Sequence, residues 1–166
     1  MYLTPDAIFN TFDELTVEYL KEHEIKYLIL DVDNTLIPYE ETLPRPGVLS
    51  WLGELKEAGI SVALVSNNHK ARLYAFNASL GYPAFYDSFK PRKKNMLKAM
   101  RAMGADIAHT ANIGDQIFTD TWAGRRLGIK TFLVPPIKDK RDPFTRFKRL
   151  CEKPFIKAYY KGKEEQ

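Results

Sequence analysis

The 166-residue sequence contains one cysteine, Cys151, and no apolar run that approaches the about 20 residues needed to cross a bilayer. A single cysteine excludes an intramolecular disulfide and a cysteine-rich metal site, so Cys151 is expected to be a small side chain on a C-terminal helix. Residues 1–6 show no basic segment followed by an apolar one, and they do not resemble a secretory signal. These absences favour a cytoplasmic protein.

The charge of the chain is distributed unevenly. The net charge is +4, but residues 138–166 alone carry ten Lys or Arg against five Asp or Glu. A length of 166 residues suits one domain with a real core, and the sequence contains no repeat or low-complexity segment. We therefore expect a single domain over residues 1–166 that ends in a basic, aromatic extension over 138–166. Such an extension could bind lipid headgroups or nucleic acid, or it could form only a solvated helix face.

Alternating apolar runs and helical patterns predict an α/β fold. The expected strands lie within residues 27–30, 60–65, 82–86, 108–113 and 129–134. The expected helices cover 13–22, which would begin after Thr11, and 48–58, 70–80, 93–103 and 120–127. The regular alternation indicates a parallel sheet with right-handed crossovers. We expect a three-layer α/β/α, Rossmann-like domain with a mostly parallel five-stranded sheet.

Residues 31–35, Asp-Val-Asp-Asn-Thr, follow the first apolar strand directly. Open α/β sheets bind ligands at the carboxyl ends of their strands. Asp31 and Asp33 are two residues apart in an extended segment, so their carboxylates point the same general way and could hold Mg²⁺. One carboxylate could attack a phosphoryl group and form an aspartyl-phosphate while the other moves protons. The alternative is that these residues merely form a polar turn.

Two further polar clusters follow the next two strands. Ser66 and Asn67 stand at a strand-to-helix turn, where a hydroxyl and backbone amides can cradle phosphate oxygens, although either residue could simply cap the helix. Lys90 precedes Pro91 and is therefore expected to be extended and in a loop. It could neutralise phosphate or carboxylate charge, or belong to a plain basic surface together with residues 92–94.

A fourth cluster follows the fourth strand, with Asp115 directly after it and Asp120 five residues later. All four clusters lie at the carboxyl ends of strands in one predicted sheet, and parallel topology would bring those ends together. Coincidence is therefore a weak explanation for their positions.

In order and spacing, the four clusters resemble the four motifs of the haloacid dehalogenase superfamily of phosphatases, over residues 25–134. The resemblance implies that Asp31 is the nucleophile and that Asp33 is the acid/base. It implies that Lys90 steadies the nucleophile and the transferring group. The implied substrate-binding residues are Ser66, which would hold a phosphoryl oxygen, Asn67, and Thr35, which would support the geometry of the first motif.

The resemblance also implies a magnesium site. Its ligands would be Asp31, the backbone carbonyl of Asp33 and Asp115, with Asp120 acting through water. Carboxylates packed this closely repel one another, and Mg²⁺ would relieve that repulsion while it screens the anionic substrate from the anionic nucleophile.

Residues 37–47 and 82–89 are too short to hold a cap domain, so an open site and a phosphorylated substrate that is large or presented from a surface are expected. The sequence resembles the capless subclass IIIA and its YqeG-type branch, which is similar to phosphatidylglycerophosphate phosphatases. This likeness implies a phosphomonoester hydrolase with phosphatidylglycerophosphate as a candidate substrate. The alternatives are a phosphatase for a soluble or macromolecular phosphate (nucleotide, sugar, phosphoprotein or RNA end), or a binding protein that docks on RNA or a ribosomal partner.

The C-terminal extension interleaves apolar Phe144, Phe147 and Leu150 with Lys and Arg, as suits the interface of an anionic membrane. Peripheral contact with the inner face of the membrane is one expectation. The helical spacing of these residues and Cys151 favours packing against the core, and Pro154 is expected to interrupt the helix. No nucleic-acid-binding module is recognised in the extension. Contacts of His69 and Tyr39 with substrate and the oligomeric state are left open.

Overall fold

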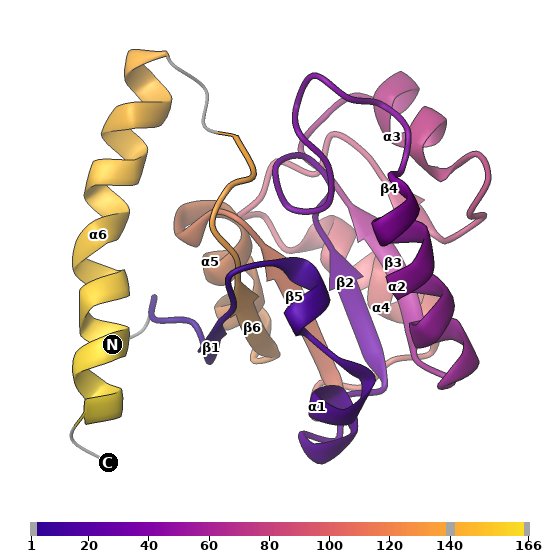
Figure 1. Ribbon diagram of the computed structural model, residues 1–166, viewed down its shortest axis with the longest axis horizontal. Coiled ribbons are helices and arrows are strands. Elements are labelled where there is room, and N and C mark those ends of the chain that lie inside the picture. Colours follow the sequence, from indigo (N-terminus) through magenta and orange to yellow (C-terminus); the bar gives the residue numbers. More distant parts are fainter. Residues whose placement is uncertain (1–2, 139–141, 165–166) are drawn as a thin grey trace.

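A six-stranded parallel sheet forms the centre of the computed structural model, which describes residues 3–138 and 142–164 (Figure 1). The strand order is β1-β6-β5-β2-β3-β4. The strands are β1 (Ala7–Ile8), β2 (Tyr27–Leu30), β3 (Ser61–Val65), β4 (Ala84–Phe85), β5 (Thr110–Gly114) and β6 (Lys130–Leu133). The sequence predicted five of these strands and missed β1, because its two residues are not part of an apolar segment as long as residues 82–86, which contain the equally short β4.

Six α-helices flank the sheet. They are α1 (Val17–Glu22), α2 (Pro46–Glu57), α3 (Lys70–Asn77), α4 (Lys94–Met103), α5 (Trp122–Leu127) and α6 (Pro143–Glu164). The strands and helices predicted within residues 27–134 agree with the structure to within about three residues at each end, which is the usual uncertainty of predicted boundaries.

The sheet is covered on both faces. Leu28 and Leu30 of β2 belong to one buried cluster, which also contains side chains of α1, α2 and α3. The intervening Ile29 belongs to a second cluster, formed with side chains of α4 and α5. Because successive side chains of a strand point to opposite faces, the two clusters are the two faces of one sheet. The predicted three-layer α/β/α, Rossmann-like fold is therefore confirmed, with six strands rather than five.

The first predicted helix, 13–22, is divided into two parts. Phe12–Glu14 form a 3-10 helix, and Thr11 makes no side-chain capping bond there. α1 begins only after Thr16, whose Oγ1 accepts a hydrogen bond of 3.2 Å from the amide of Tyr19. The prediction that the helix starts after Thr11 was wrong, because two threonines compete as helix caps and only the second makes the bond.

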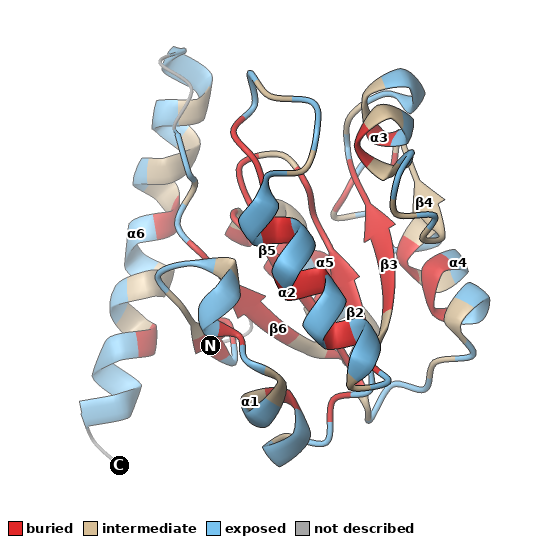
Figure 2. Cartoon of the chain, turned by 45° about the vertical axis from the view of Figure 1, so that its right-hand side comes forward, coloured by how far each residue is buried: buried red, intermediate tan, exposed pale blue. Residues whose placement is uncertain are grey.

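Helix α6 lies along the β1 side of the molecule and is exposed over much of its surface (Figures 1 and 2). The prediction that Pro154 interrupts this helix was wrong, since α6 is continuous through it. Pro154 cannot donate to the carbonyl of Leu150, but both residues are exposed, so water can bind that carbonyl. Residues 139–141 and 165–166 of the predicted extension lie outside the described residues.

The inward face of α6 also differs from the prediction. Phe144, Phe147 and Leu150 are 70%, 64% and 59% exposed and do not pack into the core, while Cys151 is half-buried. Glu152 and Tyr159 are buried instead. Polar contacts of α6 with the body, described below, select which side of the helix faces inward. None of the helices in the described ranges is both long enough and apolar enough to cross a bilayer.

Candidate active site

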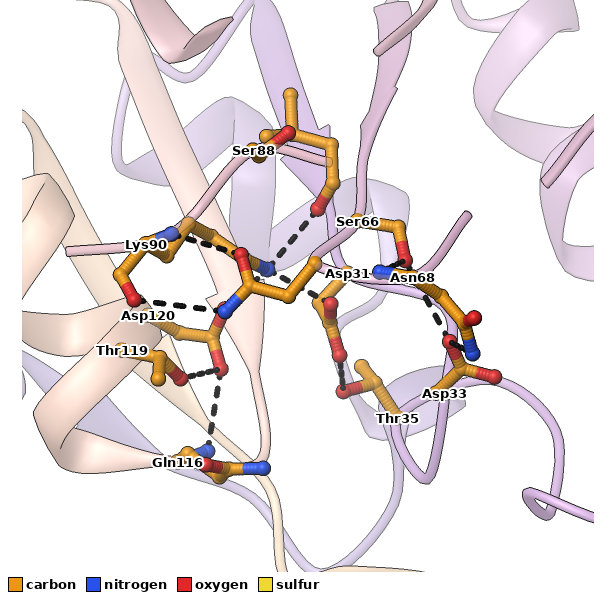
Figure 3. A network of polar contacts seen from close by, with 12 residues as sticks. Asp31, Asp33, Thr35, Ser66, Asn68, Ser88, Lys90, Gln116, Thr119 and Asp120 are labelled. Atoms are coloured by element: carbon orange, nitrogen blue, oxygen red, sulfur yellow. Dashed lines mark hydrogen bonds and ion pairs between the residues drawn. The ribbon is translucent and has the colours of Figure 1, made fainter. Parts of the chain in front are cut away.

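The four polar clusters meet at one edge of the sheet. β2 pairs with β3 on one side and with β5 on the other, and Leu30 is in register with Leu64 and Ile113. The residues that follow these strands, Asp31, Ser66 and Asp115, consequently stand side by side. Lys90 reaches the same edge from the loop after β4, and Asp120 from the helical turn between β5 and α5 (Figure 3).

Lys90 bridges two of the carboxylates. Its Nζ donates hydrogen bonds to Asp31 Oδ1 (2.7 Å), to Asp120 Oδ1 (2.6 Å) and to the carbonyl of Val65 (2.9 Å). The side chain is only 4% exposed, so Lys90 is not part of a basic surface. Burial lowers its pKa, but the charges of Asp120 and Asp31 raise it more, and the pKa of Lys90 lies above its ordinary value. Lys90 is therefore a fixed cation at neutral pH.

Asp31, Asp115 and Asp120 form a buried carboxylate cluster. One oxygen of each lies within 4.8 Å of the others. Burial, with the charges of neighbouring carboxylates adding to it, raises the pKa of Asp31 well above its ordinary value and that of Asp115 to about 7. Asp115 Oδ1 is buried and has no hydrogen-bond partner among the described residues. Because a divalent cation takes oxygen ligands and would relieve this crowding, the three residues fit a metal site.

The position of Asp120 depends on the glycine that ends β5. A Cβ atom on Gly114 would lie 2.2 Å from Asp120 Cγ, so only glycine leaves room for this carboxylate. Asp120 Oδ2 accepts hydrogen bonds from the amide of Gln116 (3.2 Å) and from Thr119 Oγ1 (3.0 Å). Thr119 and Asp120 belong to a π-helical turn, Ile117–Thr121, that follows Gln116 and precedes α5. The sequence predicted an α-helix from residue 120 and did not indicate this turn, a feature that is frequent at functional sites.

Asp33 is held apart from the carboxylate cluster. Arg72 of α3 forms an ion pair with its Oδ1, and Asn68 Nδ2 and Ser66 Oγ donate to its Oδ2 at 3.1 and 3.4 Å. The guanidinium of Arg72 also lies 5.0 Å from the ring centre of Tyr39. The sequence analysis missed Arg72, since its distance from the first motif gives no signal of this contact.

Two predicted substrate-binding residues contact other site residues. Thr35 Oγ1 donates to Asp31 Oδ2 at 3.0 Å, as expected of a residue that supports the first motif. Asn67 Oδ1 accepts a 2.7 Å hydrogen bond from the amide of Lys90 and so holds the Lys90 loop in place. In the described structure the side chains of both residues orient the site's own ionisable groups.

Helix α6 contributes a second cation to the cluster. Arg149 forms an ion pair with Asp115 Oδ2, and its Nη1 lies 3.0 Å from Glu152 Oε2. Glu152 is 2% exposed and accepts a 2.8 Å hydrogen bond from the amide of Ile117. These contacts fix α6 beside the site. The sequence analysis missed Arg149 and Glu152, because no motif links α6 to the end of β5.

Replacement of Arg149 by Met is expected to destabilise the fold by about 3–5 kcal/mol, because Asp115 and Glu152 would then be buried carboxylates without their cation. Chemical denaturation measures this change. The matched control is Lys148→Met, which removes a 2.6 Å hydrogen bond from Nζ to Gln116 Oε1 and an ammonium 5.6 Å from the ring centre of Phe144, and it is expected to cost about 1–2 kcal/mol. An equal loss of unfolding free energy in the two variants would show that the ion pairs of Arg149 stabilise the fold no more than the contacts of Lys148 do.

The site opens into a cleft of about 490 Å³. His69 and Tyr39 lie in its wall, although His69 Nδ1 also bonds Asp87 Oδ1 at 2.8 Å. On the side of α6, Phe144 and Lys148 line the cleft. The wall therefore combines carboxylates and amides with the ammonium of Lys148 and the exposed ring of Phe144.

Known structures resemble this fold. The cobalt-bound deoxy-D-mannose-octulosonate 8-phosphate phosphatase of Haemophilus influenzae superposes with a TM-score of 0.56 at 19% identity, covering 84% of this chain and 91% of that one. The 3-deoxy-D-manno-octulosonate 8-phosphate phosphatase of Moraxella catarrhalis, in complex with magnesium, phosphate and KDO, gives 0.50 at 20% identity, covering 89% and 92%. These likenesses concern the fold.

Sequence comparison identifies the family. Residues 5–128 match the family of haloacid dehalogenase-like hydrolases. The probable phosphatase YqeG of Bacillus subtilis (strain 168) is 36% identical over 157 residues, which cover 95% of this chain and 91% of that protein. Since the family match includes all four clusters and the relative extends over nearly the whole chain, this protein belongs to the haloacid dehalogenase-like hydrolase family.

Proposed function

We propose that the protein is a magnesium-dependent phosphomonoester hydrolase that forms an aspartyl-phosphate on Asp31. The observation that carries the proposal is the setting of Asp31, whose carboxylate is held between Lys90 Nζ and Thr35 Oγ1 beside two further buried carboxylates. A nucleophile fixed in this way needs little reorganisation to reach a bound phosphoryl group. The name of the Bacillus subtilis relative, a probable phosphatase, agrees with this activity.

The reaction proceeds in two displacements. A carboxylate oxygen of Asp31 bonds to phosphorus, the bond from phosphorus to the ester oxygen breaks, and that oxygen takes a proton from Asp33. Water then attacks the phosphorus and passes its proton to Asp33, while the bond to Asp31 breaks and inorganic phosphate leaves. In the structure the Asp33 carboxylate pairs with Arg72, so it must turn away from Arg72 to reach the ester oxygen of the substrate.

The metal would be held by Asp31, Asp115 and the carbonyl of Asp33, with Asp120 contributing through water. When bound, Mg²⁺ supplies positive charge that offsets the charge of the phosphate and of the nucleophile. Lys90 supplies a second positive charge beside Asp31, at a fixed position. Arg149 leaves Asp115 Oδ1 as the oxygen without a hydrogen bond, which is the oxygen available to a ligand.

The proposed substrate is a lipid phosphate, with phosphatidylglycerophosphate as the candidate. Between β2 and β3 the chain adds only a loop and α2, and between β3 and β5 only α3, β4 and α4. These segments do not form a cap, so the cleft can accept a phosphate presented from a surface. Phe144 and Lys148 at the cleft wall offer an apolar and a cationic contact to such a substrate.

A phosphatase screen tests this function. With Mg²⁺, we expect turnover of phosphatidylglycerophosphate in mixed micelles with a higher kcat/KM than that of nucleotide, sugar and phosphopeptide monoesters, and loss of turnover in EDTA. A preference for one of the soluble or macromolecular substrates would contradict the lipid assignment and leave the hydrolase intact. Absence of hydrolysis across the whole screen would favour a binding protein.

A further inference from the structure

Helix α6 presents an outer face that combines apolar and basic side chains. Phe147 and Leu150 are 64% and 59% exposed, and Arg146, Lys153 and Lys157 are exposed as well. In a helix with 3.6 residues per turn these positions lie within one half of the circumference, opposite the buried Glu152 and Tyr159. Figure 2 shows the pale blue surface of α6 on the side away from the sheet. We call these five residues the outer face of α6.

The charge of this surface is predominantly positive. Over Pro143 to Lys163, all of which is described, Glu152 is the only acidic residue, and it is buried against Arg149 and the amide of Ile117. The exposed charged residues of that stretch are all Lys or Arg, and Glu164, the exposed last residue of α6, adds one negative charge. Because surfaces of a soluble domain usually mix both signs, a partner with dense negative charge fits this one best.

We propose that the outer face of α6 docks the enzyme on an anionic membrane. Phe147 and Leu150 would enter the boundary between headgroups and acyl chains, and Arg146, Lys153 and Lys157 would reach the anionic headgroups with their long side chains. The phosphates of an RNA could pair with the basic side chains of this face, but RNA offers little apolar surface for Leu150 to contact. A second copy of the chain would bring like charges together across the contact. An anionic bilayer offers negative headgroups to the basic side chains and an apolar interior to Phe147 and Leu150.

Docking through this face would bring the active site near the membrane. Phe144, one turn before Phe147, lies in the wall of the cleft and is 70% exposed. The apolar end of the outer face and the mouth of the cleft are therefore adjacent. If the proposed lipid phosphatase activity holds, the face supplies the substrate-bearing surface; the docking itself does not depend on that activity.

Vesicle sedimentation tests the docking with the full chain. We expect sedimentation with vesicles of equal parts phosphatidylglycerol and phosphatidylcholine, and little with phosphatidylcholine alone. The variants F147S/L150S and K153E/K157E should each lower partitioning to the anionic vesicles by at least about tenfold, since each basic side chain and each buried apolar group contributes to membrane affinity. High salt should weaken binding of the wild type.

Matched controls come from other surfaces. K94E/K98E makes the same charge change at the same spacing on α4, which lies far from α6 in Figures 1 and 2. L43S/I107S removes two apolar side chains that are 67% and 55% exposed. Both controls should sediment like the wild type. Equal loss in controls and α6 variants, wild-type binding by the α6 variants, or binding of single-stranded RNA in place of the vesicles would overturn the proposal.

A catalytic readout separates this proposal from the proposed function. The α6 variants should hydrolyse a soluble aryl phosphate at the wild-type rate, which also verifies that they fold. A wild-type protein that binds anionic vesicles but hydrolyses nothing would refute the phosphatase and keep the docking surface. A wild-type protein that hydrolyses aryl phosphate but does not bind the vesicles would refute the docking surface and keep the phosphatase.

Discussion

The Asp31→Asn variant is expected to lose phosphatase activity by about 10³-fold or more while it keeps the fold. The amide cannot act as a nucleophile toward phosphorus, and removal of a residue that makes and breaks bonds has effects of at least this size. Asn has nearly the shape of Asp, and Asp120 still pairs with Lys90. Steady-state hydrolysis of an aryl phosphate with Mg²⁺ measures the loss, and circular dichroism measures the fold.

The control for this variant is Asp106→Asn. Asp106 is an exposed carboxylate that pairs with His109 after α4 and does not line the cleft, so activity should stay near that of the wild type. Acid quenching of wild-type turnover should also trap a phosphoryl group on Asp31 that the Asn variant lacks. Substantial hydrolysis by the Asn variant would mean that Asp31 is not the nucleophile.

The Lys90→Met variant should lose both activity and stability. Lys90 is the cation that two buried carboxylates share, and removal of one partner from a buried ion pair typically costs about 3–5 kcal/mol. Chemical denaturation without metal should show a loss of that size. Added Mg²⁺ should recover part of the loss, because a ligand that binds only the folded state stabilises it. Activity should remain low with metal, since Lys90 also contacts Asp31, the proposed nucleophile.

Lys93→Met is the control for Lys90. Lys93 is exposed and lies just before α4, so its removal should change the free energy of unfolding by less than about 0.5 kcal/mol. If Lys90→Met unfolds at the same denaturant concentration as Lys93→Met, the carboxylates do not depend on Lys90 for their burial, and the electrostatic account of the site fails.

Much of the site could be predicted from the sequence because its residues lie directly beside recognisable strands. Each of Asp31, Ser66 and Asp115 directly follows an apolar run, and parallel topology then brings strand ends together without further information. The three-layer fold follows from the same alternation. What the sequence could not show were contacts between segments whose local patterns are unremarkable.

Three features that the sequence did not predict depend on such contacts between distant segments. β1 is only two residues long and is fixed by distant bonds, such as that from the amide of Asp6 to the carbonyl of Thr131 at 2.8 Å. Arg72 forms its ion pair with Asp33 from α3, a helix whose sequence contains no recognised motif. In α6, the helical spacing of Phe144, Phe147 and Leu150 indicated an apolar inward face, but the pairing of Arg149 with Asp115 turned a different side toward the body.

The contact between Arg149 and Asp115 also has a consequence for the order in which the protein is synthesised. Asp115 is made 34 residues before Arg149, and the last strand, β6, is complete at Leu133. A nascent chain thus possesses every strand of the sheet before it possesses the guanidinium that pairs with Asp115. Asp115 therefore gains its ion-pair partner only after α6 has been made, so this edge of the sheet is completed by a helix that follows every strand in the order of synthesis.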